Sequence, residues 1–186
     1  MQFTVHPLTL DLWPAFEDLF SDSAVCSRCW CMYWRIGAAY RRRPGKARKT
    51  AFREIVKRGP PPGLLAFEGE VAVGWCQVTP RAQVPELDRA WRLQRMDDLP
   101  VWSLSCFYVR KGYRRRGLNA VLIDAALKAA QQAGAPALEA YPLDRSLTPS
   151  TTSTGVVSTF ERAGFKTAAC RVPARPIMRH DLKGIG

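Results

Sequence analysis

A glycine-bounded run of arginines, Gly112–Gly117, has the composition of an anion-binding loop. It follows the longest strand-like run of the chain, Val101–Val109, and leads into a helical pattern with apolar residues at positions 118, 121, 122, 125 and 129. The first N–H groups of a helix lack partners within the helix, and the helix dipole favours negative charge there. Because five basic residues and no acidic residue lie in Arg110–Arg116, the sequence predicts a site for a phosphate-containing group, such as a pyrophosphate.

The residues around this loop exclude two common phosphate-binding motifs. Gly112 and Gly117 have the GxxxxG spacing of a P-loop, but Leu118 and Asn119 stand where a P-loop needs Lys and then Ser or Thr. The dinucleotide-binding pattern needs a further glycine where the backbone approaches a pyrophosphate, and this loop has none at that position. The loop is therefore of another type.

Two short segments, Arg114–Asn119 and Phe160–Phe165, carry a resemblance to a known family. Together they resemble the GNAT superfamily of acetyl-CoA-dependent N-acetyltransferases, whose signature is [Arg/Gln]-x-x-Gly-x-[Gly/Ala] after a long strand. Arg114 and Gly117 match this signature, and Asn119 departs from its last position. Phe160–Phe165, FERAGF, is similar to the family's Tyr-Glu-Lys-x-Gly-Phe segment on the last helix. The resemblance covers residues 64–182, and more weakly the N-terminal strand and two helices.

The resemblance implies how the chain would bind acetyl-CoA or a related acyl-CoA. Backbone N–H groups from Arg115 to Ala120 would hold the pyrophosphate, and arginine side chains would add charge. The backbone of Phe107–Val109 would pair with the pantetheine arm where the strands Val101–Val109 and Ala137–Tyr141 splay apart, and one of its N–H groups would polarise the acetyl carbonyl. The cofactor-binding residues implied are Phe107, Tyr108, Val109, Arg114, Arg115, Arg116, Gly117, Leu118, Asn119 and Ala120.

A general base is the first catalytic requirement of acetyl transfer to an amine. A lysine-like amine has a pKa of about 10.4, so a base or a depressed pKa must supply the neutral form. Val101–Val109 contains no carboxylate, although many family members carry a glutamate on this strand. Glu139 on the neighbouring strand is the candidate base; Asp97, Asp98 and a chain of water molecules are the alternatives, and a structural carboxylate is the other interpretation of Glu139.

A general acid for the departing thiolate is the second requirement. Family members often place a tyrosine at the position of Phe160, and phenylalanine cannot donate a proton. Tyr141 shares a strand face with Glu139 because the two are two residues apart, so Tyr141 is the candidate replacement. A tyrosine packed at the sheet edge is the alternative, and positioning alone can suffice for a thiolate leaving group.

Aromatic residues between the first two predicted helices are candidates for the acceptor site, since the family often uses this region for it. Three large rings, Trp30, Tyr33 and Trp34, could form an apolar pocket, and burial in the core is the alternative.

The neighbouring cysteines raise the question of a zinc site. Cys26, Cys29 and Cys31 supply three possible thiolates, but a strong zinc signal needs two separated pairs, and the chain has only two histidines. We therefore expect reduced thiols packed with tryptophans and no metal.

The elements that position these residues follow from the periodicity of apolar residues. With 186 residues the chain is expected to form one domain, 1–186. Residues 1–63 are predicted to hold a strand and two helices, Leu12–Phe20 and Thr50–Lys57, on the acceptor side, and residues 64–186 the acetyl-CoA-binding core. The predicted class is mixed α/β: a single-domain GNAT-like fold with a twisted mixed sheet of six or seven strands flanked by about four helices.

Composition and charge limit the remaining function classes. The chain is 47% hydrophobic and 24% charged, as in globular proteins. It lacks an apolar run of membrane-spanning length and a visible secretory signal, so we expect a cytoplasmic location and no membrane partner.

The formal net charge is +12, and Arg41–Arg58 holds nine basic residues against one acid. A basic nucleic-acid- or ribosome-associated binding protein is therefore one alternative, and a CoA-binding protein without catalysis is another. The acceptor is expected to be a small-molecule or peptide amine; its identity, the acyl chain length and a homodimer stay open.

Overall fold

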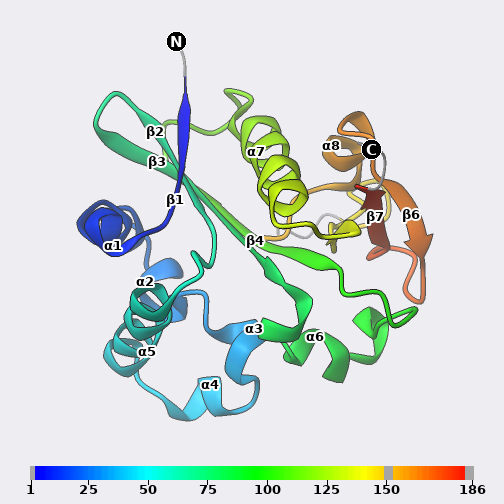
Figure 1. Ribbon diagram of the computed structural model, residues 1–186, viewed down its shortest axis with the longest axis horizontal. Helices are drawn as coiled ribbons and strands as arrows, with labels where there is room; N and C mark the ends of the chain where they lie inside the picture. Colours follow the sequence, from blue (N-terminus) through cyan, green and yellow to red (C-terminus); the bar gives the residue numbers. More distant parts are fainter. Residues whose placement is uncertain (1–2, 149–152, 183–186) are drawn as a thin grey trace.

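The centre of the protein is a seven-stranded mixed sheet in the order β1-β2-β3-β4-β5-β7-β6 (Figure 1). The computed structural model describes residues 3–148 and 153–182. All neighbouring strands are antiparallel except β4 and β5, which are parallel. The strands are β1 (Thr4–Pro7), β2 (Leu64–Glu68), β3 (Val71–Pro80), β4 (Trp102–Val109), β5 (Ala137–Ala140), β6 (Lys166–Ala169) and β7 (Ile177–Asp181).

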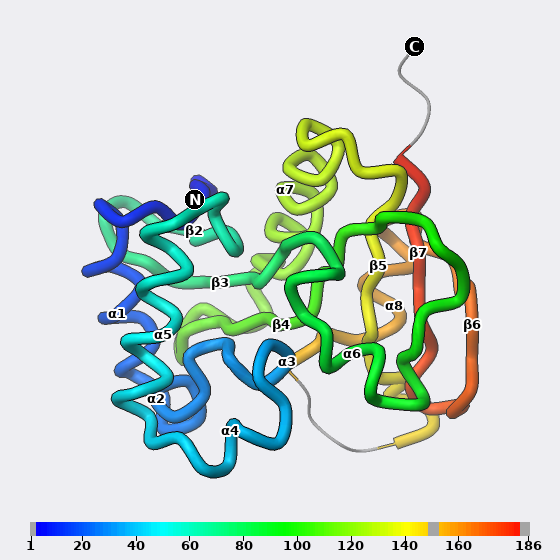
Figure 2. The backbone as a smooth tube through the Cα atoms, turned by 60° about the horizontal axis from the view of Figure 1, so that its bottom comes forward, coloured from blue at the N-terminus to red at the C-terminus, as the bar shows by residue number. Residues whose placement is uncertain are grey.

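Helices cover both faces of this sheet. Figure 2 shows α1, α2 and α5 grouped together, away from α7. None of the helices in the described ranges is long and apolar enough to cross a membrane. The helices are α1 (Trp13–Ser21), α2 (Cys26–Cys29), α3 (Tyr33–Ile36), α4 (Ala39–Arg42), α5 (Gly45–Arg58), α6 (Glu86–Arg89), α7 (Leu118–Gln132) and α8 (Val157–Arg162), with short 3-10 helices at η1 (Leu10–Leu12), η2 (Arg81–Gln83) and η3 (Trp91–Leu93). The predicted fold class and strand number are confirmed, with α1, α5, α7 and α8 as the helices longer than one turn.

Two apolar cores form on opposite sides of the sheet. On one side α7 buries a stripe at helical spacing against β2, β3 and β4, consisting of Leu118, Leu122, Ile123, Ala126 and Ala130. Gly74 of β3 permits this close approach, because a Cβ there would lie 2.7 Å from the Leu118 side chain. On the other side α1, α2 and α5 form an aromatic core around Phe16, Phe52 and Trp75. The start of α7 is thus fixed firmly against the middle of the sheet.

The central strand β4 is irregular where it leaves β5. Opposite β3 the register runs from Gln77 and Cys106 directly to Val78 and Leu104, so Ser105 is an extra residue, as in a β-bulge. β5 pairs only with Trp102–Leu104 of β4. The second half of β4 therefore has no neighbouring strand on the β5 side, which is the predicted separation of the two strands.

The region between α1 and α5 differs from the prediction of two helices in residues 1–63. Three single-turn helices, α2, α3 and α4, fill it. They stay short because Trp30 and Cys31 have φ values of 48° and 52°, Gly37 has a φ of 51°, and Pro44 precedes α5. A left-handed residue interrupts the helical path even where the side chains favour a helix.

Candidate functional site

The loop before α7 presents unpaired backbone N–H groups at the end of β4. Gly117 is the N-cap of α7 with a φ of 79°, and Arg115 has a φ of 62°. Within the described residues, the amides of Arg115, Gly117, Leu118 and Asn119 have no hydrogen-bond partner. A Cβ on Gly117 would meet no atom within 4 Å, so the space in front of the helix is open. This arrangement suits an anion of pyrophosphate size.

The three arginine side chains of this loop are placed differently from one another. Arg116 pairs with Glu68 of β2 at 2.5 Å and lies over the ring of Tyr113, so its charge is compensated. Arg114 donates through Nε to the carbonyl of Val109 at 3.3 Å and remains exposed. Arg115 is also exposed. Arg114 and Arg115 can therefore contact a phosphate, whereas Arg116 anchors the loop to the sheet.

Asn119, which departs from the family signature, has a buried side-chain oxygen without a partner. Buried polar atoms in proteins are almost always hydrogen-bonded.

The free edge of β4 faces the loop before α8. Alternation along β4 turns the N–H groups of Phe107 and Val109 towards this edge. The amide of Phe107 donates to the carbonyl of Ser153 at 2.5 Å. Leu143, beyond the end of β5, donates in turn to Gly155 at 3.0 Å. The backbone around Ser153 thus occupies part of the edge predicted to pair with pantetheine.

A cavity of about 280 Å³ opens between the α2–α4 region, the middle of the sheet and the segment around Ser153. The lining combines rings, thiols, hydroxyls and two arginines, and no carboxylate from the described residues contributes to it. The lining residues are Val25, Cys29, Cys31, Tyr33, Trp34, Tyr40, Gln77, Arg92, Cys106, Ser153, Thr154 and Arg175.

The three aromatic residues predicted to line an acceptor pocket are divided between this cavity and the core. Tyr33 and Trp34 line the cavity. Trp30 is only 3% exposed and stacks on Trp13 and Phe20. Its left-handed backbone turns the ring into the aromatic core, so Trp30 supports the wall of the cavity from behind.

Thiols from two distant parts of the chain meet at the cavity. Cys29 and Cys31 come from α2 and its exit, and Cys106 comes from β4. Burial raises the pKa of Cys29 and Cys31, and an interaction with the Cys31 thiol lowers the pKa of Cys106. Trp75 donates its indole N–H to Cys31 at 3.1 Å. In the part of the chain that the structure describes, no group of three His, Cys, Asp or Glu residues is arranged to hold a metal ion.

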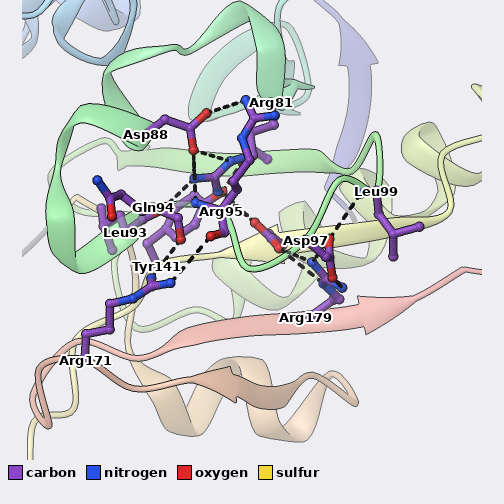
Figure 3. Close-up of polar contacts among 12 residues, drawn as sticks. Arg81, Asp88, Leu93, Gln94, Arg95, Asp97, Leu99, Tyr141, Arg171 and Arg179 are labelled. Atoms are coloured by element: carbon purple, nitrogen blue, oxygen red, sulfur yellow. Dashed lines mark hydrogen bonds and ion pairs between the residues drawn. The ribbon is translucent and has the colours of Figure 1, made fainter.

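Glu139 and Tyr141 lie in a buried polar network centred on Arg81. Figure 3 shows Arg81, Tyr141 and Arg179 of this network. Nη1 of Arg81 donates to Glu139 at 2.8 Å and to the Tyr141 hydroxyl at 2.7 Å. Arg179 holds the other oxygen of Glu139 at 2.7 Å, and Ser103 lies 2.8 Å from the Tyr141 hydroxyl. Glu139 is 1% exposed and Tyr141 is fully buried, and burial raises the pKa of Tyr141. Neither residue lines the acceptor-side cavity.

The outer part of this network consists of aspartates on the segment between β3 and β4. Arg81 donates through Nη2 to Asp88 at 2.7 Å, and Arg95 binds the other oxygen of Asp88 at 2.8 Å. Burial opposes the ionised form, but the hydrogen bonds from Arg95 and Arg81 lower the pKa of Asp88 to about 2. Asp97 pairs with Arg179. A second cavity of about 230 Å³ is lined by Arg81, Asp97, Glu139 and Arg179 among others, and all four are ion-paired.

The basic segment Arg41–Arg58 is partly used in packing. Arg48 is buried with its guanidinium 4.0 Å from the ring centroid of Tyr40, and Lys49 pairs with Glu17. The remaining charges of this segment form an exposed face on α4 and α5. This division weakens the interpretation of the whole run as a nucleic-acid surface.

A comparison with family models decides the family. The model described as the Acetyltransferase (GNAT) family matches residues 13–165. The chain belongs to the GNAT acetyltransferase family.

Solved structures of similar fold include several GNAT proteins. The PaiA N-acetyltransferase from Thermoplasma acidophilum, solved in complex with coenzyme A, has a TM-score of 0.57 and 15% identity, covering 97% of this chain and 99% of its own. The ribosomal-protein-S18-alanine N-acetyltransferase from Escherichia coli has a TM-score of 0.54 and 14% identity, covering 100% and 97%. The GNAT domain of S. lividans PAT has a TM-score of 0.56 and 16% identity, covering 95% and 89%. No curated protein matches the chain in sequence.

One residue that matches the GNAT signature and one that departs from the family pattern, Gly117 and Phe160, lie at the start of α7 and on α8. Gly117 is the N-cap of α7. Phe160, at the position where many GNAT members carry tyrosine, is fully buried on α8, with its ring 6.0 Å from that of Phe107 and 5.1 Å from that of Phe165. It packs beneath the free edge of β4 and supports that edge.

Arg81 is a residue of this region that sequence reasoning missed. It lies directly after β3, in a polar stretch with no periodicity. Its side-chain partners lie on β5, directly after β5, on α6 and on η3. A charged residue at the end of a buried strand was the only available signal.

Proposed function

We propose that this GNAT protein transfers an acetyl group from acetyl-CoA to a primary amine by direct attack in a ternary complex. The observation that carries this proposal is the row of unpaired amides at Arg115, Gly117, Leu118 and Asn119, placed where β4 loses its β5 neighbour. Such a row favours the pyrophosphate at one end, and the free edge of β4 favours an extended arm that leads inward.

The residues divide into two regions in this proposal. Residues 64–186 hold the cofactor, with the exposed Arg114 and Arg115 adding charge at the phosphates. Residues 1–63 form half of the lining on the acceptor side, where Cys29, Tyr33 and Tyr40 contribute to the cavity. Cys106 of β4 lines the same cavity. The acetyl group and the amine would therefore meet beside Cys106 and Phe107.

The chemistry in the cavity depends on positioning more than on a dedicated base. The neutral amine nitrogen attacks the acetyl carbon, the bond to sulfur breaks, the CoA thiolate leaves with the electron pair, and the nitrogen gives one proton to water. The Phe107 amide, once released by Ser153, can donate to the carbonyl oxygen as negative charge develops. The cavity has no carboxylate from the described residues, so the amine must enter neutral or lose its proton to water.

We propose that Glu139 and Tyr141 position β4 and do not exchange protons with the substrates. The Tyr141 hydroxyl joins Ser103 of β4 to the Arg81–Glu139 pair. This link fixes the point from which β4 and β5 diverge. It therefore holds the free edge of β4 in a fixed position.

Acetyl-CoA is expected to raise the melting temperature of the protein. A ligand at about 100 times its Kd adds about 2.7 kcal/mol, which for a chain of this length corresponds to roughly 5–10 °C. The measurement is a thermal-shift titration with acetyl-CoA, with ATP and NAD as controls. A shift with acetyl-CoA alone, followed by acetylation in an amine panel, supports the proposal.

Two results would contradict this function. A shift without transfer to any amine would favour a CoA-binding protein that lacks catalysis. No shift at millimolar acetyl-CoA would mean that the loop before α7 is not a cofactor site, and salt-dependent binding to a mixed oligonucleotide would then favour the nucleic-acid-binding alternative.

Direct attack makes a separate prediction for Cys106. No acetyl group should accumulate on the protein when it is incubated with acetyl-CoA alone, and Cys106→Ser should retain kcat within about threefold, since no protein nucleophile is needed. Intact-mass spectrometry and steady-state kinetics measure the two results, with Cys170→Ser, on the exposed side of the sheet edge, as the matched control. An acetylated peptide containing Cys106, together with an inactive Cys106→Ser variant, would replace direct attack by a two-step transfer.

A further inference from the structure

We infer that the acceptor carries an anionic group, a carboxylate or a phosphonate, in addition to its amine, and that arginines at the 280 Å³ cavity bind this group. This inference rests on the proposed function and specifies its substrate class. It follows from an imbalance of charge at the cavity.

Two arginines line the cavity without a compensating acid. Arg92 and Arg175 both contribute to the lining, and among the described residues neither forms an ion pair. Within the part of the chain that the structure describes, the Arg175 side chain donates to neutral oxygens alone, the carbonyl of Tyr141 at 3.2 Å and the hydroxyl of Thr154 at 3.3 Å. Burial and the neighbouring charge of Arg92 lower the pKa of Arg175. Two like charges that are partly removed from water lack the partner that buried charges normally have.

A third guanidinium lies just behind the cavity. Arg35 donates through Nε to Gln77 at 3.3 Å and through Nη1 to the carbonyl of Gln83 at 3.2 Å. Its Nη2 is buried and has no partner, and burial lowers the pKa of Arg35 to about 10. Gln77 itself lines the cavity, so the positive charge of Arg35 acts on the same space.

The pairing of other arginines shows that this imbalance is local. Carboxylates neutralise four buried or partly buried arginines outside the cavity, which are Arg81, Arg110, Arg116 and Arg179. Arg48, also outside the cavity lining, instead lies over the ring of Tyr40. At these four positions the chain supplies an acid for the arginine. Within residues 3–148 and 153–182 it supplies none at Arg35, Arg92 and Arg175, where a ligand would provide it.

The size and lining of the cavity fit a small acidic amine. A volume of about 280 Å³ is at the lower end of small-molecule sites. The rings of Tyr33 and Trp34 can contact the apolar part of such a molecule, and an arginine fork matches a carboxylate or phosphonate in a bidentate manner. A purely cationic polyamine would meet repulsion instead.

The test measures binding of acetylated products and their neutral forms. We would titrate the protein, with and without CoA, with the twenty N-acetylated amino acids, with their carboxamides, and with N-acetyl-aminomethylphosphonate and its dimethyl ester. At least one acid is expected to bind about tenfold or more tightly than its neutral partner, because charge-assisted hydrogen bonds are the stronger class. Comparing the affinities of the carboxylate and the phosphonate compounds shows which of the two anionic groups the cavity prefers.

Variants assign the preference to the cavity. Arg92→Gln and Arg175→Gln are each expected to reduce the preference for the acid by about tenfold, while leaving the affinity for the neutral form unchanged. Arg162→Gln, an exposed position on α8, is the matched control and should keep the preference. If Arg175→Gln does not fold, Arg92→Gln still tests the inference, because Arg92 forms no ion pair with the described residues.

The inference is overturned if no acid binds more tightly than its neutral form, or if both variants keep the preference of the wild type. Acetyl-CoA binding, measured on the same samples, separates this failure from failure of the proposed function. Bound acetyl-CoA without acid preference rejects only the substrate class. Acid preference without acetyl-CoA binding rejects the proposed transfer.

Discussion

Replacement of Gly117 by Glu is expected to raise the Kd for acetyl-CoA by at least about 100-fold, because the new carboxylate would repel the pyrophosphate at the end of the helix where anions bind. The space in front of Gly117 is empty, so the side chain has room to extend towards the phosphates. Its backbone φ of 79° would be strained by any side chain. Isothermal titration of the folded variant with acetyl-CoA measures the effect.

Two controls separate charge from strain. Gly117→Ala introduces the same strained backbone without a charge and should lose much less affinity. Gly134→Glu places the same residue at the opposite end of α7, where φ is 73° and the space is equally open, and should leave the affinity unchanged. Wild-type affinity in Gly117→Glu would remove the loop before α7 from the cofactor site.

Replacement of Arg81 by Gln is expected to destabilise the fold by about 3–5 kcal/mol, the usual cost of removing one member of a buried ion pair. Arg81 is 6% exposed and contacts Glu139, Tyr141, Asp88 and the carbonyl of Leu93. The loss leaves Glu139, at 1% exposure, with only one arginine. Urea unfolding monitored by tryptophan fluorescence measures the change in free energy of unfolding.

The matched control for this effect is Arg95→Gln. Arg95 binds the same Asp88, but its side chain is 59% exposed. A surface ion pair contributes at most about 1 kcal/mol, so Arg95→Gln should cost no more than that. If the two variants lose the same free energy of unfolding, the buried contacts of Arg81 contribute no more to stability than the exposed ion pair of Arg95.

The loop before α7 was more predictable from sequence than the lining of the 280 Å³ cavity. The loop at Gly117 and the helix after it are local features, because glycine, arginine and apolar spacing lie within one short segment. The separation of β4 from β5 followed from the family resemblance. The loop and the helix depend on residues that are neighbours in the chain, whereas the strand separation involves two distant segments.

The acceptor side depends on contacts between distant residues, which spacing does not reveal. Cys106 meets Cys29 and Cys31 only because β4 runs beside the exit of α2. Trp30 lies in the core because its left-handed backbone redirects the ring, although its neighbours Tyr33 and Trp34 line the cavity. Arg81 carries no local signal beyond its charge at the end of a buried strand, because each of its side-chain partners comes from another element.

The contact between Ser153 and Phe107 has a consequence for ligand affinity. An arm that pairs with β4 must first take the Phe107 amide from the Ser153 carbonyl. The measured Kd is then the intrinsic Kd divided by the fraction of molecules in which that amide is free. Each 1.4 kcal/mol by which the closed form is favoured weakens binding about tenfold. Residues near Ser153 that never touch the cofactor can therefore set the acetyl-CoA concentration at which the protein becomes half-saturated.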